Sequence, residues 1–140
     1  MFHKVTGIGR LGRDPDFKFL PSGTGCANMN VAVNRTYTDS NAQKITETIW
    51  IRLVAWGNLA ENCNQYLAKG KMIFFEGRLN ADTETGGPKL FTRKDGTVGS
   101  NFEVTVQNVI FLSSKSEDQA YQGQNQSGFS DDVDEDDIPF

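Results

Sequence analysis

The sequence predicts an all-β domain in which five strands form a barrel and one helix lies between the third and fourth strands. Apolar and polar residues alternate with period two in several segments, glycines interrupt the first strand, and one segment has helical spacing. The length of 140 residues suits one compact domain plus a tail. We expect the barrel at 1–112, a flexible Ser/Gln-rich linker at 113–129 and an acidic tail at 130–140.

The first half of the chain predicts three strands. Residues 5–11 form the first, and Gly7 and Gly9 within it indicate bulges or strong coiling, as at a barrel corner. Turn signals at 13–16 and 21–25 bound a short strand or edge at 17–20. Residues 26–37 alternate, which predicts a half-buried strand. One face carries Ala27, Met29, Val31 and Val33, and the other carries Asn28, Asn30, Ala32 and Asn34.

Residues 46–56 predict the third long strand, which has two contrasting faces. Side chains alternate across a strand, so this segment has an ordinary core row and a second row that should face solvent. The core row is Ile49, Ile51, Leu53 and Ala55, and the second row is Trp50, Arg52, Val54 and Trp56.

A single helix follows. Gly57 interrupts the strand, Asn58 is the expected N-cap and Glu61 the N3 partner of a capping box. Gly70 is expected at the C′ position. The predicted buried stripe is Leu59, Cys63, Tyr66 and Leu67.

The second half completes the barrel. Residues 72–79 read as a strand, 80–99 as a long polar hairpin and 102–111 as the last strand. The resulting order of five strands with one helix between strands three and four is that of an OB-fold barrel.

The charge is unevenly distributed. Residues 1–112 carry thirteen Lys and Arg against ten Asp and Glu, whereas residues 113–140 carry Lys115 against eight acids, for a net charge of −4. A basic body favours an anionic partner. Cys26 and Cys63 match no metal spacing and are expected to be reduced and at least partly buried, as in cytoplasm. No signal peptide or membrane span is expected.

Catalytic chemistry has little support. His3 is the sole histidine, and the glycine-rich segment at 7–12 lacks the lysine and the following helix of a phosphate-binding loop. We therefore expect no catalytic residues, no cofactor and no metal. An OB-containing nuclease or ligase fragment would need carboxylate or lysine constellations that the sequence lacks.

Aromatic residues interleaved with cations instead predict single-stranded nucleic acid binding, because bases stack on rings while cations track phosphates. Trp50, Arg52 and Trp56 meet this need within one strand. Further candidates are Lys4 and Arg10 on the first strand, Arg35 and Tyr37 on the second long strand, Phe74 and Arg78 on the fourth, and Phe91 with Lys89, Arg93 and Lys94 on the hairpin.

Structural interpretations compete with several of these assignments. Trp56 fits equally a position packed under the helix, and Trp50 a packing or oligomer contact. Either Phe74 or Phe75 must point inward, and the alternation does not say which. The segment 89–94 also fits a solvated hairpin.

The last eleven residues suggest a docking peptide. Six acidic side chains precede Ile138, Pro139 and Phe140. Such a segment buries too little apolar surface to order itself. Its apolar end and α-carboxylate suit a partner's pocket, and a simple solubility tail is the alternative.

Together these motifs resemble the bacterial single-stranded DNA-binding protein (SSB) family. The segments that carry the resemblance are 9–15, 48–61, 66–71, 76–79 and the terminal Asp136, Asp137, Ile138, Pro139 and Phe140. The resemblance implies a homotetramer of OB folds that wraps single-stranded DNA in the cytoplasm, associated with the nucleoid. It also implies that the tail tip recruits replication, recombination and repair proteins.

The resemblance also assigns individual positions. Trp50 falls where the family has a stacking Trp, Trp56 where it has Phe or Trp, and Tyr37 where it often has Trp. The family's aromatic residue on the fourth-strand hairpin has no counterpart, and Phe91 is the candidate replacement. The alternative function is an OB-fold primosome module or an RNA-binding module. The Ile-Pro-Phe end argues against it, because it implies that this chain recruits other proteins.

Overall fold

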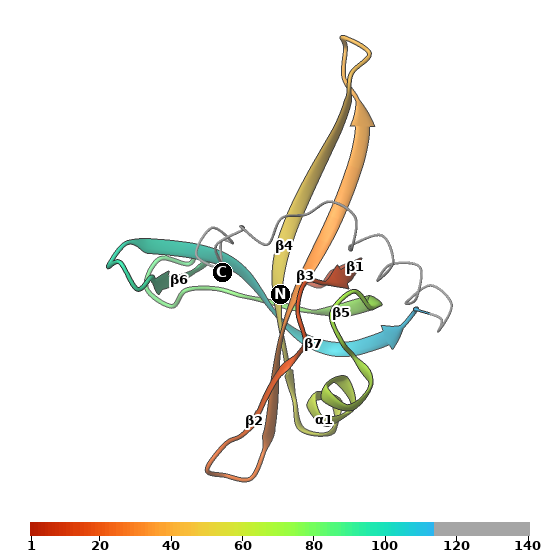
Figure 1. Ribbon diagram of the computed structural model, residues 1–140. Helices are drawn as coiled ribbons and strands as arrows, with labels where there is room; N and C mark the ends of the chain where they lie inside the picture. Colours follow the sequence, from red (N-terminus) through yellow and green to blue (C-terminus); the bar gives the residue numbers. More distant parts are fainter. Residues whose placement is uncertain (114–140) are drawn as a thin grey trace.

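The computed structural model describes residues 1–113. This part of the chain contains seven strands and one helix (Figure 1). The elements are β1 (Val5–Leu11), β2 (Asp16–Phe19), β3 (Gly25–Thr38), β4 (Lys44–Trp56), α1 (Gly57–Tyr66), β5 (Met72–Asn80), β6 (Lys89–Thr92) and β7 (Val98–Phe111).

Five of the strands close into the predicted barrel. They pair in the order β1-β5-β7-β4-β3, and β3 returns to β1 through Arg10 opposite Ala32 and Leu11 opposite Val31. The β4–β7 pair is parallel and the other pairs are antiparallel. The OB-fold prediction is confirmed, with β2 added at the edge of β3 and β6 at the edge of β7.

The barrel interior is apolar and is built from alternate residues, as the period of the strands requires. Ile73 and Phe75 of β5 are fully buried, so Phe74 is the residue that points outward. The other core members are Leu11, Ala27, Met29, Val31, Leu53, Ala55, Ala60, Cys63, Leu67, Val104 and Val106. Cys26 and Cys63 are free and buried, as expected.

β3 and β4 continue beyond the barrel as a long two-stranded ribbon (Figure 1). Their pairing runs from Cys26 opposite Trp56 to Thr38 opposite Lys44. Ile49 lies on this ribbon and is 51% exposed, so its assignment to the core row was wrong. The alternation along β4 is correct, but Ile49 lies beyond the barrel, so its side of the strand is left exposed there.

Two glycines permit close approach of strands. A Cβ at Gly9 would lie 2.4 Å from the carbonyl oxygen of Ala32, where β1 meets β3. A Cβ at Gly77 would lie 2.1 Å from the carbonyl oxygen of Thr105, next to the register shift between Glu76 and Gly77. Glycine at these corners lets the backbones approach and the barrel close.

The helix boundaries differ from the prediction. Trp56 is the N-cap, with extended backbone and no side-chain cap, and Asn58 lies inside the helix, so the predicted capping box is absent. The helix ends at Tyr66 with Leu67 as C-cap, which places Gly70 beyond the C′ position. Tyr66 is exposed and Ala60 takes its place in the buried stripe. The chain turns sharply at Gly57, whose φ is 64°, and the helix starts there, two residues earlier than predicted.

The predicted polar hairpin contains additional sheet. Residues 89–92 form β6, and β7 begins at Val98 rather than at 102. No helix among residues 1–113 has the length and hydropathy needed to cross a membrane. Apart from Ser113, the predicted linker at 113–129 lies outside the described residues, as does the acidic tail at 130–140.

Candidate nucleic-acid interface

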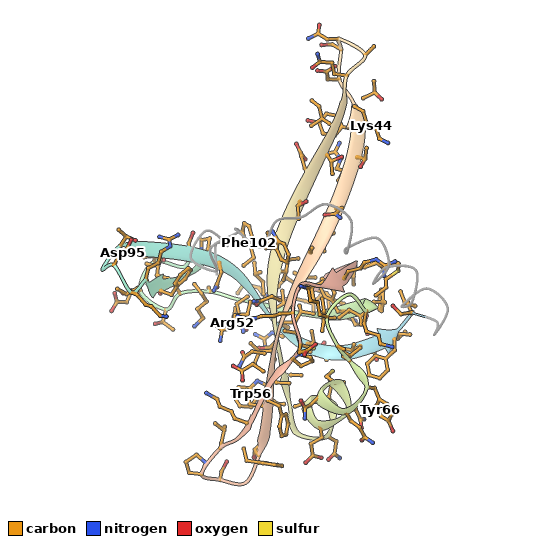
Figure 2. All side chains as sticks on the ribbon, viewed as in Figure 1. Lys44, Arg52, Trp56, Tyr66, Asp95 and Phe102 are labelled. Atoms are coloured by element: carbon orange, nitrogen blue, oxygen red, sulfur yellow. The ribbon has the colours of Figure 1, made fainter. Side chains whose placement is uncertain are left out.

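The side of the sheet that carries Trp50, Arg52 and Trp56 is here called the outer face. Trp56 is 45% exposed, and Trp50 and Arg52 are half-buried, so neither indole is enclosed in the barrel. Figure 2 shows Arg52 and Trp56 following one another along β4. The alternation of β4 thus places two rings and one guanidinium on a solvent-facing surface.

Trp50 lies across the neighbouring strands. It pairs with Ala32 of β3, which in turn pairs with Arg10 of β1. A Cβ at Gly12 would stand 2.6 Å from Cζ3 of the indole, so the ring covers Gly12 closely. The six-membered ring of Trp50 therefore lies against Gly12, next to the end of β1.

Arg10 lies in the cross-strand row of Trp50, Arg13 follows Gly12, and both side chains are anchored to the protein. Nη1 of Arg10 donates to the carbonyl oxygen of Gly70 at 2.9 Å. With its amide oxygen turned toward Arg13, Asn30 accepts from both Nε and Nη2 of that residue at 2.9 Å. Arg13 is a cation beside the face that the sequence analysis missed, because it was assigned to a turn.

Arg52 belongs to a polar network that joins four strands. Its Nε and Nη2 donate to Oδ1 of Asn28 at 3.3 and 3.1 Å, and its Nε lies 3.9 Å from Oε2 of Glu103. Nδ2 of Asn80 donates to Oε1 of Glu103 at 3.0 Å and to Oγ1 of Thr105 at 2.8 Å. These contacts fix the polar groups between the two tryptophans.

The outer face continues onto the β6–β7 arm. Phe91 is paired with Gly99, and a Cβ at Gly99 would stand 2.6 Å from Cζ of the Phe91 ring. Residues 99, 101 and 103 alternate onto the same side as Glu103, so Phe91 shares the outer face with the tryptophans. The guanidinium of Arg93 lies 5.4 Å from the centre of the Phe91 ring. Lys89, opposite Asn101, adds a second cation.

Lys18 and Arg78 flank this surface. Lys18 is exposed on β2 and shares a cross-strand row with Cys26 and Trp56. The sequence analysis missed Lys18 because it treated residues 17–20 as an isolated edge. Pairing this segment with the strand that begins near Cys26 would have placed Lys18 in the same row as Trp56. Arg78 is exposed opposite Thr105, and it lines a shallow pocket with Gln107 and the N-terminal residues 1–3.

Arg35 and Tyr37 are not brought to the outer face. Their partners are Glu47 and Ile45, which lie on the opposite side of the ribbon from Trp50. Arg35 lies 4.8 Å from the centre of the Tyr37 ring and 3.9 Å from Glu47. The Tyr37 hydroxyl donates to Oε1 of Glu47 at 3.2 Å, and this hydrogen bond, with the negative charge of Glu47, raises the pKa of Tyr37.

Lys4 and Phe74 lie on another surface, formed by β1, β5 and β7. Nζ of Lys4 is 3.1 Å from Oε2 of Glu76. Phe74 pairs with Ile8 on one side and with Ile110 on the other, and both isoleucines are exposed. This environment is a continuous apolar row, which suits a protein contact better than a stacking site.

The profile of the "Single-strand binding protein family" matches residues 2–112. The chain belongs to this family. Single-stranded DNA-binding proteins from Chlorobaculum tepidum and Staphylococcus aureus are each 33% identical to this chain, over 157 and 149 residues respectively. The alignments cover 97% of the first relative and 90% of the second. These alignments cover 99% and 100% of this chain.

Other matches differ in length. The single-stranded DNA-binding protein of Neisseria meningitidis is 32% identical over 115 residues, which cover 82% of this chain and 62% of the relative. A Plasmodium falciparum SSB in complex with single-stranded DNA has a TM-score of 0.66 at 25% identity and covers 81% of this chain and 97% of that one. A deletion mutant of the single-stranded DNA binding protein from Thermus aquaticus has a TM-score of 0.61 at 27% identity. The match covers 81% of this chain and 51% of that chain. The chain thus spans less than two thirds of some relatives.

Proposed function

We propose that this protein binds single-stranded DNA without sequence preference. The observation that carries the proposal is the position of Trp50, Trp56 and Phe91 on one outer face with cations beside them. Membership of the single-strand binding protein family supports the same conclusion. The chemistry is binding rather than catalysis, since the arrangement offers rings and cations for a polyanion.

The mechanism combines stacking with charge. A base that lies on an aromatic ring gains about 1–3 kcal/mol, and any base has a π-face, so the interaction tolerates sequence. Gly12 and Gly99 have no side chain that would collide with Trp50 and Phe91, so both rings can lie close to the sheet. Both rings are only partly buried, which leaves part of each ring accessible to a base. Arg10, Lys18 and Lys89 lie near enough to these rings in the register to meet phosphates.

The oligomer that we propose is a homotetramer, and two features support contacts between copies. Val5 to Gly9 of β1 pair with β5 alone among the described strands, which leaves one strand edge open. Ile8, Phe74 and Ile110 form an apolar row next to that edge, in which both isoleucines are exposed and Phe74 is half-buried. An open edge beside apolar surface is a template for pairing with the same strand of a second copy.

The tail supplies the proposed contact with other proteins. Its acidic residues would steer encounter, and Ile138, Pro139 and Phe140 would dock replication, recombination and repair proteins. Because the protein would coat single-stranded DNA, we propose that it acts in the bacterial cytoplasm at the nucleoid.

A titration with oligo-dT tests the proposed function. The chain has two tryptophans, both on the outer face, so their emission should be quenched as bases stack. Trp50→Ala should weaken binding by roughly tenfold, about the stacking energy of one base. Tyr66→Ala, which removes an exposed ring from α1, is the matched control.

Two results would contradict the proposal. One is the absence of quenching at low salt together with an unchanged affinity of Trp50→Ala. The other is tighter binding of an RNA oligomer than of a DNA oligomer of the same length in direct competition, which would indicate an RNA-binding module.

A further inference from the structure

The outer face has a carboxylate at its centre. Glu103 of β7 lies opposite Arg52 in the parallel β4–β7 ladder, and its side chain is 18% exposed. Oε1 of Glu103 accepts from Asn80, and Oε2 lies 3.9 Å from Nε of Arg52. A negative charge in the middle of a surface for phosphates opposes binding, so its position calls for an explanation.

The neighbours of Arg52 use only some of its N–H donors. Asn28 accepts from Nε and Nη2, and Glu103 lies near Nε. Nη1 has no partner among residues 1–113. A guanidinium carries five N–H donors in a planar fork, so this side chain retains donors for a further anion.

The ion pair itself is weak. A separation of 3.9 Å is at the long limit for an ion pair, the contact involves one nitrogen, and the Arg52 side chain is 38% exposed. Such pairs contribute little in water, whereas a phosphate that meets a guanidinium through two parallel hydrogen bonds binds more strongly. A nucleic-acid phosphate would therefore displace Glu103 as the partner of Arg52.

We propose that Glu103 limits the affinity of the outer face for single-stranded DNA. In the unbound protein it neutralises Arg52 and, with Asn28, keeps the guanidinium along the sheet. When DNA binds, a phosphate replaces Glu103 as the partner of the Arg52 guanidinium. The repulsion between Glu103 and this phosphate lowers the affinity for DNA and favours its release. This inference rests on the proposed function, and Glu103 acts in it as a positioning residue.

The test compares Glu103→Gln with Glu61→Gln. Both substitutions remove one negative charge, but Glu61 is exposed on α1, whose buried residues Ala60 and Cys63 face the core rather than the outer face. Binding of a labelled dT oligomer is followed by fluorescence anisotropy across salt concentrations. Glu103→Gln should bind about two- to fivefold more tightly at low salt, the range that exposed ion pairs imply. The slope of log K against log salt should steepen by about 0.7, one additional counterion.

A double variant tests whether Glu103 acts through Arg52. In the background of Arg52→Met, Glu103→Gln should have no larger effect than Glu61→Gln, because its partner is gone. If circular dichroism shows that Glu103→Gln is unfolded, the test uses Arg52→Met alone. The proposal then requires that Arg52→Met binds the oligomer more weakly than the wild type and that its slope of log K against log salt is shallower by about 0.7.

Three outcomes overturn the inference: equal effects of Glu103→Gln and Glu61→Gln, weaker binding by a folded Glu103→Gln, or an unchanged Arg52→Met. They differ from failure of the proposed function, in which the wild-type chain itself does not bind the oligomer.

Discussion

The indole of Trp50 covers Gly12: a Cβ at Gly12 would stand 2.6 Å from Cζ3 and 2.9 Å from Cη2 of the ring. The residue that positions the candidate stacking ring therefore lies 38 residues earlier in the chain, on the turn after β1. Gly12 is not among the glycines with positive φ, so an alanine fits the backbone there.

Gly12→Ala should therefore leave the fold intact and move the Trp50 ring. We expect about fivefold weaker binding of oligo-dT, part of the stacking energy of one base, and less quenching of tryptophan emission. Gly87→Ala is the control, since its added Cβ would stand 3.5 Å from Oγ1 of Thr85, an ordinary contact. Equal affinity and quenching in the two variants would show that the ring position does not matter.

Gly77→Ala should destabilise the barrel. The added Cβ would be 2.1 Å from the carbonyl oxygen of Thr105 and 2.8 Å from Cα of Val106, and backbone atoms cannot rotate away as a side chain does. We expect a loss of about 3 kcal/mol in the free energy of unfolding, measured by urea denaturation. A stability equal to that of Gly87→Ala would contradict the close approach of β5 and β7.

Phe74→Asp should disrupt the association of copies. The substitution places a charge in the apolar row between Ile8 and Ile110, where desolvation of a carboxylate is costly. Analytical sedimentation should show a smaller assembly than the wild type. Phe19→Asp, a change at an exposed ring on the β2 edge, should leave the assembly unaltered. Retention of the wild-type mass by Phe74→Asp would exclude this face as the interface.

Cys63 should make stability depend on alkaline pH. Burial raises the pKa of its thiol from about 9 to about 11. Between these values the unfolded chain releases the proton first, so the stability present below pH 9 is lost as the pH rises toward 11. Urea midpoints at pH 8 and 10.5 should differ more for the wild type than for Cys63→Ala, and iodoacetamide should not label the native thiol at pH 8. An identical shift in both proteins would refute this effect.

Removal of residues 138–140 should separate the two proposed activities. Partner proteins of replication and repair should no longer be retained by the immobilised protein, because the apolar residues that would fill the partner's pocket are removed. The affinity for oligo-dT should be unchanged or slightly higher, since the tail is acidic and repels phosphate. A loss of DNA affinity on this deletion would refute the division of labour.

Local patterns predicted the strands and one face of the site well. The alternation along β4 placed Trp50, Arg52 and Trp56 on a common side, because a strand has a period of two whatever surrounds it. The same rule left Phe74 and Phe75 undecided, since it does not say which side is covered. Ile49 shows the same limit: its side was right, but the barrel ends before it.

The composition and the spacing of apolar residues were sufficient to determine an OB barrel of five strands with a single helix, because side-chain alternation and turn chemistry act over a few residues. Only the tertiary structure decided that Glu103 and Asn80 meet Arg52, that Gly12 lies under Trp50, and that Arg35 and Tyr37 lie on the other side of the ribbon. These contacts depend on strand register and barrel closure. They join residues far apart in the chain, so no local pattern encodes them.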